Sequence, residues 1–147
     1  MSKYYIGFDC GTQSTKVAIY SEDTTCVAEN SIPTVITYPS AGWAEMDADH
    51  YLNSVREGIK ACLEKSDIDP KDVRAICGDG IICGIVGVDN EGKAITPYIP
   101  YLDSRAANDA KWIRENLEPI WITESGNSVV EAFEPPVLSR WLLKNHK

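Results

Sequence analysis

The sequence predicts an α/β fold in which a short antiparallel meander precedes alternating helices and strands. Three β-rich runs come first, at residues 4–9, 16–20 and 26–37, and short polar turns join them. A stretch with helical periodicity follows, and the strand expected at 73–77 comes after it. A strand that follows a helix is typical of α/β sheets. We therefore expect a mixed sheet with flanking helices.

The first helix is expected after Asp47 or Asp49, since either aspartate can cap its N-terminus. Its apolar positions repeat at helical spacing and comprise Leu52, Val55, Ile59, Cys62 and Leu63. The second half of the chain is expected to hold a hairpin, with strands at 84–89 and 93–95 around the turn 90–92. Two further helices are expected, over 104–117 and from Pro135-Pro136 onward.

Composition excludes several classes of protein. The 147 residues amount to about one domain, and the net charge is −8. Nucleic acids and anionic membranes both attract cationic surfaces, so neither is an expected partner. No apolar run approaches the roughly 18–20 residues of a membrane span, and no secretory leader is evident. Five cysteines, an odd number without a Cys-x-x-Cys motif, are expected as reduced thiols in the cytoplasm.

One segment has the composition of a phosphate-binding turn. A Walker A motif is absent, and the near-Rossmann run at 78–84 has the wrong last spacing and precedes an expected strand. In contrast, a strand delivers Asp9 to a turn of small residues, and a second strand begins near Lys16. Such a hairpin can point N–H groups and hydroxyls at phosphate oxygens, with Asp9 on Mg²⁺. The alternative is an ordinary polar turn.

The segment 6–16 resembles the phosphate-binding opening of the FGGY carbohydrate kinases, which include xylulokinase, glycerol kinase and ribulokinase. Further segments resemble the same family in the same order: 42–47, 73–89, 101–105, 125–127 and 141–144. The resemblance implies a ribonuclease H-like fold, shared with actin and the heat-shock ATPases, in which two domains flank a cleft. The chain 1–147 would be a truncated first domain, incomplete at its C-terminal end and lacking the second domain.

The resemblance also implies a function and a set of site residues. The parent would be an ATP-dependent kinase that transfers the γ-phosphate of Mg-ATP to a sugar or polyol hydroxyl. Its general-base aspartate would lie beyond Lys147, so this chain alone is expected to be inactive. The residues expected at ATP are Asp9, Gly11, Thr12, Gln13, Ser14 and Lys16, with Asp9 also at Mg²⁺. Those expected near the sugar are Ile82, Cys83, Tyr101, Asp103 and Arg105.

Two parts of the expected sugar site are open to other interpretations. Asp103 and Arg105 could instead form a salt bridge between neighbouring elements. The loop Gly80-Ile81-Ile82-Cys83-Gly84 departs from the Gly-Gln-Met-His-Gly of xylulokinases, and Tyr101 stands where tryptophan is usual. Losing two polar side chains puts xylulose in doubt, because sugars are selected through hydrogen bonds to their hydroxyls. Core packing is the alternative for residues 81–83.

Other functions are also considered. The chain could be a catalytically silent ligand-binding or regulatory module of the same fold. A ribonuclease H-like nuclease would need carboxylates on adjacent strands and a cationic face, whereas only Asp9 is evident as a carboxylate at a strand end. The expected partner is a small sugar or polyol. An exposed apolar face is also expected, so self-association, including a homodimer, is anticipated.

Overall fold

The computed structural model describes residues 3–127 and 129–146, and the chain forms two compact units. The first unit contains the chain up to Val35 together with Asp49–Ile81. The second contains Ile36–Ala48 and the chain from Ile82 onward. Each unit has its own hydrophobic core. None of the described helices has the length and apolar character needed to cross a membrane.

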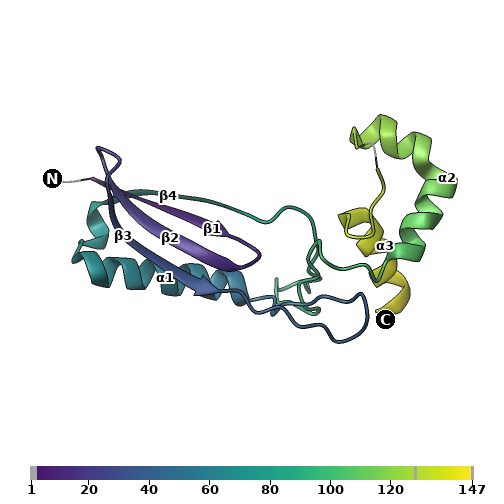
Figure 1. Cartoon of the computed structure of the whole chain (residues 1–147), viewed down its shortest axis with the longest axis horizontal. Coiled ribbons are helices and arrows are strands. Elements are labelled where there is room, and N and C mark those ends of the chain that lie inside the picture. Colours follow the sequence, from purple (N-terminus) through teal and green to yellow (C-terminus); the bar gives the residue numbers. More distant parts are fainter. Residues whose placement is uncertain (1–2, 128, 147) are drawn as a thin grey trace. The chain divides into compact units, whose positions relative to one another are not determined.

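The first unit is a four-stranded mixed sheet (Figure 1). Its strands are β1 (Tyr4–Cys10), β2 (Ser14–Ser21), β3 (Cys26–Pro33) and β4 (Val73–Gly80), in the order β3-β2-β1-β4. The first three strands pair antiparallel, and β4 pairs parallel to β1. The expected meander and α/β class are therefore confirmed.

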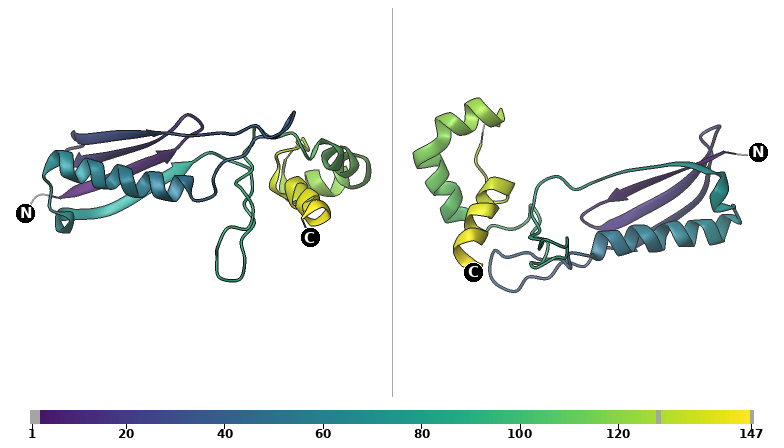
Figure 2. Two further views of the ribbon diagram at one scale, coloured as in Figure 1. Left: turned by 90° about the horizontal axis from the view of Figure 1, so that it is seen from below. Right: turned by 180° about the vertical axis from the view of Figure 1, so that it is seen from behind.

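One helix covers one face of this sheet (Figure 2). The helix α1 (His50–Ser66) begins directly after Asp49, although the Asp49 carboxylate forms no capping hydrogen bond. A short 3-10 helix, η1 (Pro70–Asp72), then leads into β4. The core under α1 contains Ile6, Val17, Ile19 and Cys62.

Small residues form the closest contact between α1 and the sheet. Ser54, Gly58 and Cys62 are the buried residues of the helix, spaced four apart on one face. A Cβ atom on Gly58 would lie 2.4 Å from Cγ2 of Val17, so only glycine permits this approach. The predicted apolar stripe is partly wrong, because Leu52 is 51% exposed. Gly58 and Cys62 contact Val17 of β2, while Ile59 and Leu63 of the predicted stripe pack against the same core.

The second unit contains the two remaining helices, α2 (Ala107–Ser125) and α3 (Pro135–Asn145). The helix α2 continues past the expected end at Leu117 and includes Pro119, and Trp121 in its last turns packs on the core of this unit. That core is formed by Ile99, Ala106, Ala110, Ile113, Val130, Val137 and Leu138.

The hairpin expected in the second unit is a long narrow loop rather than a pair of strands (Figure 2). Only isolated bridges link Val88 to Ala94 and Ile85 to Ile99. The turn itself is as expected, because Oδ1 of Asp89 accepts hydrogen bonds from the backbone N–H groups of Glu91 and Lys93, both at 2.9 Å. The prediction of two strands is wrong. Backbone bonds cross the loop from the Asp89 N–H to Lys93 and from the Ile95 N–H to Gly87, but the Gly87 N–H donates to the Thr96 hydroxyl at 2.7 Å instead of continuing a ladder.

Candidate functional site

Hydrogen bonds donated to two of its carbonyl oxygens hold the turn between β1 and β2 in place. The carbonyl oxygen of Gly11 accepts hydrogen bonds from the hydroxyls of Thr34 at 3.0 Å and Tyr51 at 3.1 Å. The carbonyl oxygen of Gln13 accepts a bond from the N–H of Thr34 at 2.9 Å. The turn is therefore anchored to the residue after β3 and to α1, which fixes the direction of its backbone.

Gly11 closes this turn tightly. Its N–H donates to the carbonyl oxygen of Ser14 at 3.0 Å. A Cβ atom at Gly11 would lie 3.0 Å from that same oxygen and 3.6 Å from Oδ2 of Asp9. The absence of a side chain thus keeps space open beside the Asp9 carboxylate.

Asp9 is exposed on the sheet face opposite α1, between a cation and a second carboxylate. Lys16 of β2 is its direct antiparallel neighbour, and Asp79 of β4 is its direct parallel neighbour. Directly paired residues present their side chains on the same face of a sheet. No motif in the sequence indicated Asp79 for the nucleotide site. The usable signal was that β4, like β1, carries an aspartate one residue before its last position.

These residues fit a magnesium ion that phosphate groups help to hold. Carboxylate oxygens are the ligands Mg²⁺ prefers, and the ion usually keeps several waters and takes only one or two carboxylates from the protein. No group of three or more His, Cys, Asp or Glu side chains is placed to hold a metal within residues 3–127 and 129–146. Asp9, with Asp79 beside it, can therefore supply protein oxygens while phosphates and water complete the shell.

Two residues that flank the turn, Cys10 and Thr15, are shielded from solvent, Cys10 only in part. Thr15 is fully buried opposite Cys10 in the β1–β2 pairing. Burial raises the pKa of the Cys10 thiol; the Thr15 hydroxyl opposes this, and the nearby carboxylates of Asp9 and Asp79 add to it. Cys10 is therefore a neutral thiol at pH 7, and it does not supply a nucleophile at this site.

The residues after β4 form a strained loop. Ile82 is 83% exposed, so the core-packing interpretation is wrong for this residue. Cys83 has a positive φ of 67°, and its carbonyl oxygen accepts a hydrogen bond from the Tyr98 hydroxyl at 2.8 Å. Gly84 follows with φ of 94°, and a Cβ there would lie 2.6 Å from the carbonyl oxygen of Ile99. The glycine is needed for this close approach to the 98–99 segment.

Asp103 and Arg105 form the salt bridge that the sequence offered as an alternative. Nε of Arg105 lies 2.9 Å from Oδ2 of Asp103, and both side chains are almost fully buried. The same oxygen accepts the Ala44 N–H at 2.7 Å, and Oδ1 accepts the Arg105 N–H at 2.8 Å. A second carboxylate, Glu45, lies 2.9 Å from the guanidinium. In this structure the pair binds the 43–45 segment.

Two tryptophans complete the surroundings of this guanidinium. Arg105 lies over the Trp43 ring at 3.9 Å and within 5.2 Å of the Trp141 ring, while the two rings meet edge to face at 5.4 Å. A cation over an aromatic face is stabilised, and more strongly when it is buried. The segments at 42–47 and 141–144 are thus joined through Arg105.

Tyr101 is partly exposed, unlike the buried Asp103 two residues later. It is 37% exposed, and its ring meets that of Phe133 edge to face at 6.4 Å. Phe133 lies just before α3, and no motif in the sequence indicated a role for it. The usable signal was a single aromatic residue in the connection 126–134, two residues before the proline pair that opens a helix.

The predicted site residues fall into two groups. All the residues expected at ATP belong to the first unit, where they lie together at the ends of β1 and β2. All those expected at the sugar belong to the second unit. Within it, Asp103 and Arg105 contact each other directly, whereas Tyr101 pairs with Phe133 and Cys83 bonds to Tyr98.

Comparison with known protein families gives one match that covers nearly the whole chain. Residues 4–147 match the N-terminal domain of the FGGY family of carbohydrate kinases. The match includes the turn at residues 11–13, the Asp103–Arg105 pair and the three helices.

Individual relatives are matched over only part of their length. The chain is 30% identical to a xylulose kinase of Staphylococcus xylosus and to a glycerol kinase of Thermoanaerobacter sp. strain X514, covering 98% and 99% of this chain. It spans 29% of each of these relatives. Among solved structures, the xylulose kinase of Rhodospirillum rubrum aligns with a TM-score of 0.87 at 26% identity, over 98% of this chain and 30% of that one.

Proposed function

Because the chain belongs to the FGGY family of carbohydrate kinases, we propose that it carries the phosphate-binding turn and part of the sugar pocket of an ATP-dependent kinase. The parent enzyme would transfer the γ-phosphate of Mg-ATP to a hydroxyl of a small sugar or polyol in the cytoplasm. All five of its cysteines are free thiols, which fits a reducing compartment.

The anchored turn at residues 11–13 is the observation that carries this proposal. Phosphoryl transfer requires the phosphates to be held rigidly, because catalysis consists mostly of positioning and charge stabilisation. Three hydrogen bonds from Thr34 and Tyr51 hold the carbonyl groups of the turn. Such a turn can present N–H groups to phosphate oxygens without reorganising.

Each residue of the turn has a proposed role. Asp9 would bind Mg²⁺, directly or through water, and the ion would neutralise charge on the phosphates. Gly11 keeps the approach to Asp9 open, and Thr12, Gln13 and Ser14 would offer N–H or side-chain groups to the γ-phosphate. Lys16, adjacent to Asp9 on the same face, would add positive charge.

The sugar contacts are proposed for exposed residues of the second unit. Tyr101 and Phe133 form an aromatic corner that could pack on a sugar ring, and Ile82 and Cys83 lie in the exposed loop. Asp103 and Arg105 are buried, so we assign them the role of holding the segment around Trp43 and Glu45. The matches to a xylulose kinase and to a glycerol kinase are equal at 30% identity, so the substrate is proposed only as a pentulose, hexulose or polyol.

Nucleotide binding can be tested on the chain itself by NMR. Titration of the isotope-labelled chain with Mg²⁺ and ADP should shift the amide signals of Gly11, Thr12 and Gln13, and Asp9→Asn should remove the effect. Asp72→Asn is the matched control, because it removes the same charge from η1 of the same unit. Absence of these shifts, or equal shifts in Asp9→Asn, would contradict the proposal.

We further propose that this chain alone has no kinase turnover, since it spans only 29% of the length of each of these kinases. A coupled ADP-release assay with a panel of pentuloses, hexuloses and polyols measures this directly. Sugar-dependent ADP release by the purified 147-residue chain would disprove it.

One observation bears on the nuclease alternative. Asp79 beside Asp9 supplies the second carboxylate on an adjacent strand that such an enzyme needs. The net charge of −8 still opposes binding to a polyanion. We therefore favour the kinase, and Mg²⁺-dependent cleavage of a labelled RNA or DNA duplex by this chain would reverse that choice.

A further inference from the structure

Two hydroxyl groups from distant parts of the chain bond to the same carbonyl oxygen of the turn between β1 and β2. Thr34 follows β3, Tyr51 lies in the first turn of α1, and both donate to the carbonyl oxygen of Gly11. Both bonds are partly buried. The backbone N–H of Thr34 also donates to the carbonyl oxygen of Gln13. The side chain and the backbone of one residue thus hold two carbonyl groups, and the second hydroxyl holds one of them again.

Both donors lie close to places where the chain passes between the two units. The chain passes between them three times, and Thr34 and Tyr51 each lie within two residues of a different crossing. The third crossing directly follows Ile81, whose N–H donates to the carbonyl oxygen of Cys10 at 3.0 Å. Donors from distant segments therefore hold carbonyl groups in and beside the turn, so the folded chain rather than the turn's own sequence sets their direction.

Holding a carbonyl group also fixes the N–H group on the other side of the same peptide bond. The peptide between Gly11 and Thr12 is trans, so its C=O and N–H groups point in opposite directions. The Thr12 N–H therefore points away from the two hydroxyls that bond to Gly11. By the same geometry the Ser14 N–H points away from the backbone N–H of Thr34, which bonds to Gln13. Both N–H groups thus face away from Thr34.

We propose that Thr34 and Tyr51 are positioning residues for the phosphate of a bound nucleotide, and that their hydroxyls act as a redundant pair. This depends on the phosphate-binding role proposed above for the turn. Either hydroxyl alone keeps the Gly11 carbonyl in place and so keeps the Thr12 N–H directed at the phosphate. With neither hydroxyl, a partly buried acceptor loses both donors, and the peptide turns toward other partners.

The expected effect on affinity depends on how often the free turn has the binding geometry. A nucleotide binds only when the N–H group faces it, so the apparent dissociation constant rises as the fraction of chains in that geometry falls. If about one chain in ten keeps this geometry without the hydroxyls, the constant rises about tenfold. Loss of one hydroxyl should change the constant by less than about threefold, because the other bond remains.

A double-mutant cycle with Tyr51→Phe and Thr34→Val measures this redundancy. Each substitution removes one hydroxyl and keeps the ring or the branched side chain. The amide signals of residues 11–14 are followed by NMR during titration with Mg²⁺ and ADP. Each single variant should bind within about threefold of wild type, and the double variant about tenfold or more weakly. Thr34→Ser keeps its hydroxyl, so Tyr51→Phe combined with Thr34→Ser should bind as Tyr51→Phe alone does.

The ligand-free chain gives a second measurement that does not depend on nucleotide binding. The Thr12 amide signal should shift and broaden in the double variant, because the peptide then exchanges between orientations. In each single variant the signal should stay near its wild-type position. Hydrogen exchange of the β2 amides establishes that each variant is folded before affinities are compared.

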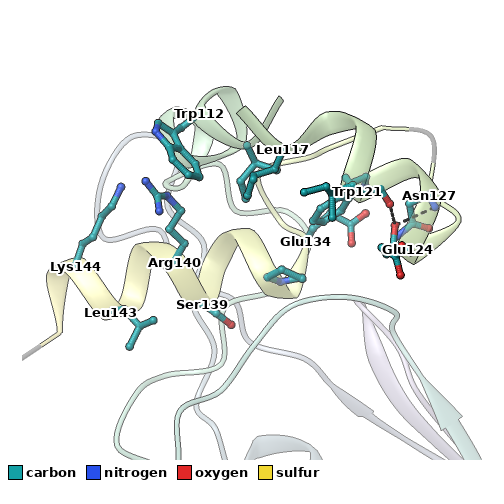
Figure 3. Close-up of a pocket in the computed structure, with 14 residues that line it drawn as sticks. Trp112, Leu117, Trp121, Glu124, Asn127, Glu134, Ser139, Arg140, Leu143 and Lys144 are labelled. Atoms are coloured by element: carbon teal, nitrogen blue, oxygen red, sulfur yellow. Dashed lines mark hydrogen bonds between the residues drawn. The ribbon is translucent and has the colours of Figure 1, made fainter. Parts of the chain in front are cut away.

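Two controls remove hydroxyl groups away from the turn. Tyr20→Phe combined with Thr25→Val removes the same two groups near the other end of β2. Ser139→Ala removes a hydroxyl that also donates to a backbone carbonyl oxygen, that of Pro135 at 2.7 Å. Ser139 belongs to the second unit, where it lines the groove between α2 and α3 (Figure 3). Both controls should bind Mg²⁺ and ADP as wild type does.

A double variant that binds ADP as tightly as wild type, with an unchanged Thr12 signal, would overturn the proposal. Tyr51→Phe alone losing as much affinity as the double variant would also overturn it, because the hydroxyls would not be redundant. Equal losses in the double variant and in the combined Tyr20→Phe and Thr25→Val control would do the same. If the wild-type chain shows no amide shifts with ADP, the phosphate-binding role itself is wrong, and this proposal is wrong with it.

Discussion

Asp79 lies directly beside Asp9 in the parallel pairing of β4 with β1. Both side chains are exposed on the sheet face opposite α1, and Lys16 lies on the other side of Asp9. Two adjacent carboxylates with a single neighbouring cation attract a divalent ion more strongly than one carboxylate does. The face that presents the turn proposed to bind phosphate therefore also concentrates negative charge.

We expect Asp79→Asn to weaken the apparent affinity for Mg²⁺ several-fold in the presence of ADP. Two charges about 4 Å apart in a water-like medium interact by roughly 1 kcal/mol, which sets the size of the effect. The measurement is a Mg²⁺ titration at fixed ADP, followed through the amide signals of residues 11–14. Asp72→Asn should leave the midpoint in place, and an equal midpoint for Asp79→Asn would show that Asp79 takes no part.

A second prediction concerns the buried pair of Asp103 and Arg105. Asp103→Asn would leave the guanidinium with one fewer carboxylate in a buried site, and such losses cost about 3–5 kcal/mol. All four tryptophans belong to the second unit, so their fluorescence during urea unfolding follows that unit alone. We expect a clear fall in the urea midpoint for this variant.

The matched control for that variant is Glu115→Gln, which removes a carboxylate from an exposed ion pair on α2. Exposed pairs contribute little, so its free energy of unfolding should stay within about 0.5 kcal/mol of wild type. If Asp103→Asn unfolded at the same urea concentration as this control, the pair would contribute nothing to the stability of the second unit.

Local patterns in the sequence predicted the fold well where one rule decided the outcome. β-rich runs joined by short polar turns predicted β1, β2 and β3, and the β-rich run after the helix predicted β4. The rotation of α1 was not predictable in this way. Helical periodicity favoured Leu52 for the core, but the close approach of Gly58 to Val17 is a tertiary contact that only the folded chain reveals.

The candidate site was predicted where its residues are consecutive and missed where they come from distant segments. Asp9 and Lys16 lie within one hairpin, so the sequence indicated both. Asp79 depends on the register of β4, and Phe133 on a contact with Tyr101 across 32 residues. Asp103 and Arg105 were identified from the sequence, with sugar contact and a salt bridge as the two interpretations of their role. Their burial favours the salt bridge, and the spacing of residues in the sequence does not reveal burial.

The third prediction follows from the contact of α1 with β2. Gly58→Ala places a methyl group 2.4 Å from Cγ2 of Val17, so the helix or the strand must shift. Overpacking of this kind costs about 1–3 kcal/mol, and the higher helix propensity of alanine returns up to about 1 kcal/mol. We expect a net loss of about 1–2 kcal/mol, measured as faster hydrogen exchange of the β2 amides.

Glu57→Ala is the control for this substitution, because it introduces the same residue at the adjacent, exposed position of α1. Its effect should stay within about 0.5 kcal/mol. If the β2 amides exchanged as slowly in Gly58→Ala as in Glu57→Ala, Val17 would be able to move aside without loss of stability. The small residues of α1 would then not determine how the helix packs.

The last prediction concerns alkaline pH and the buried thiol of Cys62. Burial raises the pKa of Cys62 above that of an unfolded thiol, which is about 8.5. The folded chain therefore binds this proton more tightly than the unfolded chain does. Stability contributed by the neutral thiol is fully present below pH 8.5 or so, and it is lost as the pH rises through the folded pKa. We expect the free energy of unfolding to fall from neutral pH to about pH 9.5, before tyrosine titrates.

Urea unfolding across this pH range, followed by circular dichroism, measures the slope. Cys62→Ala should flatten it, although Cys10, whose pKa burial also raises, keeps part of the dependence in the same unit. Cys77→Ala, at an exposed cysteine of β4, is the control and should retain the wild-type slope because it removes no buried thiol. A slope that is the same for Cys62→Ala and for Cys77→Ala would mean that the buried thiol does not link folding to pH.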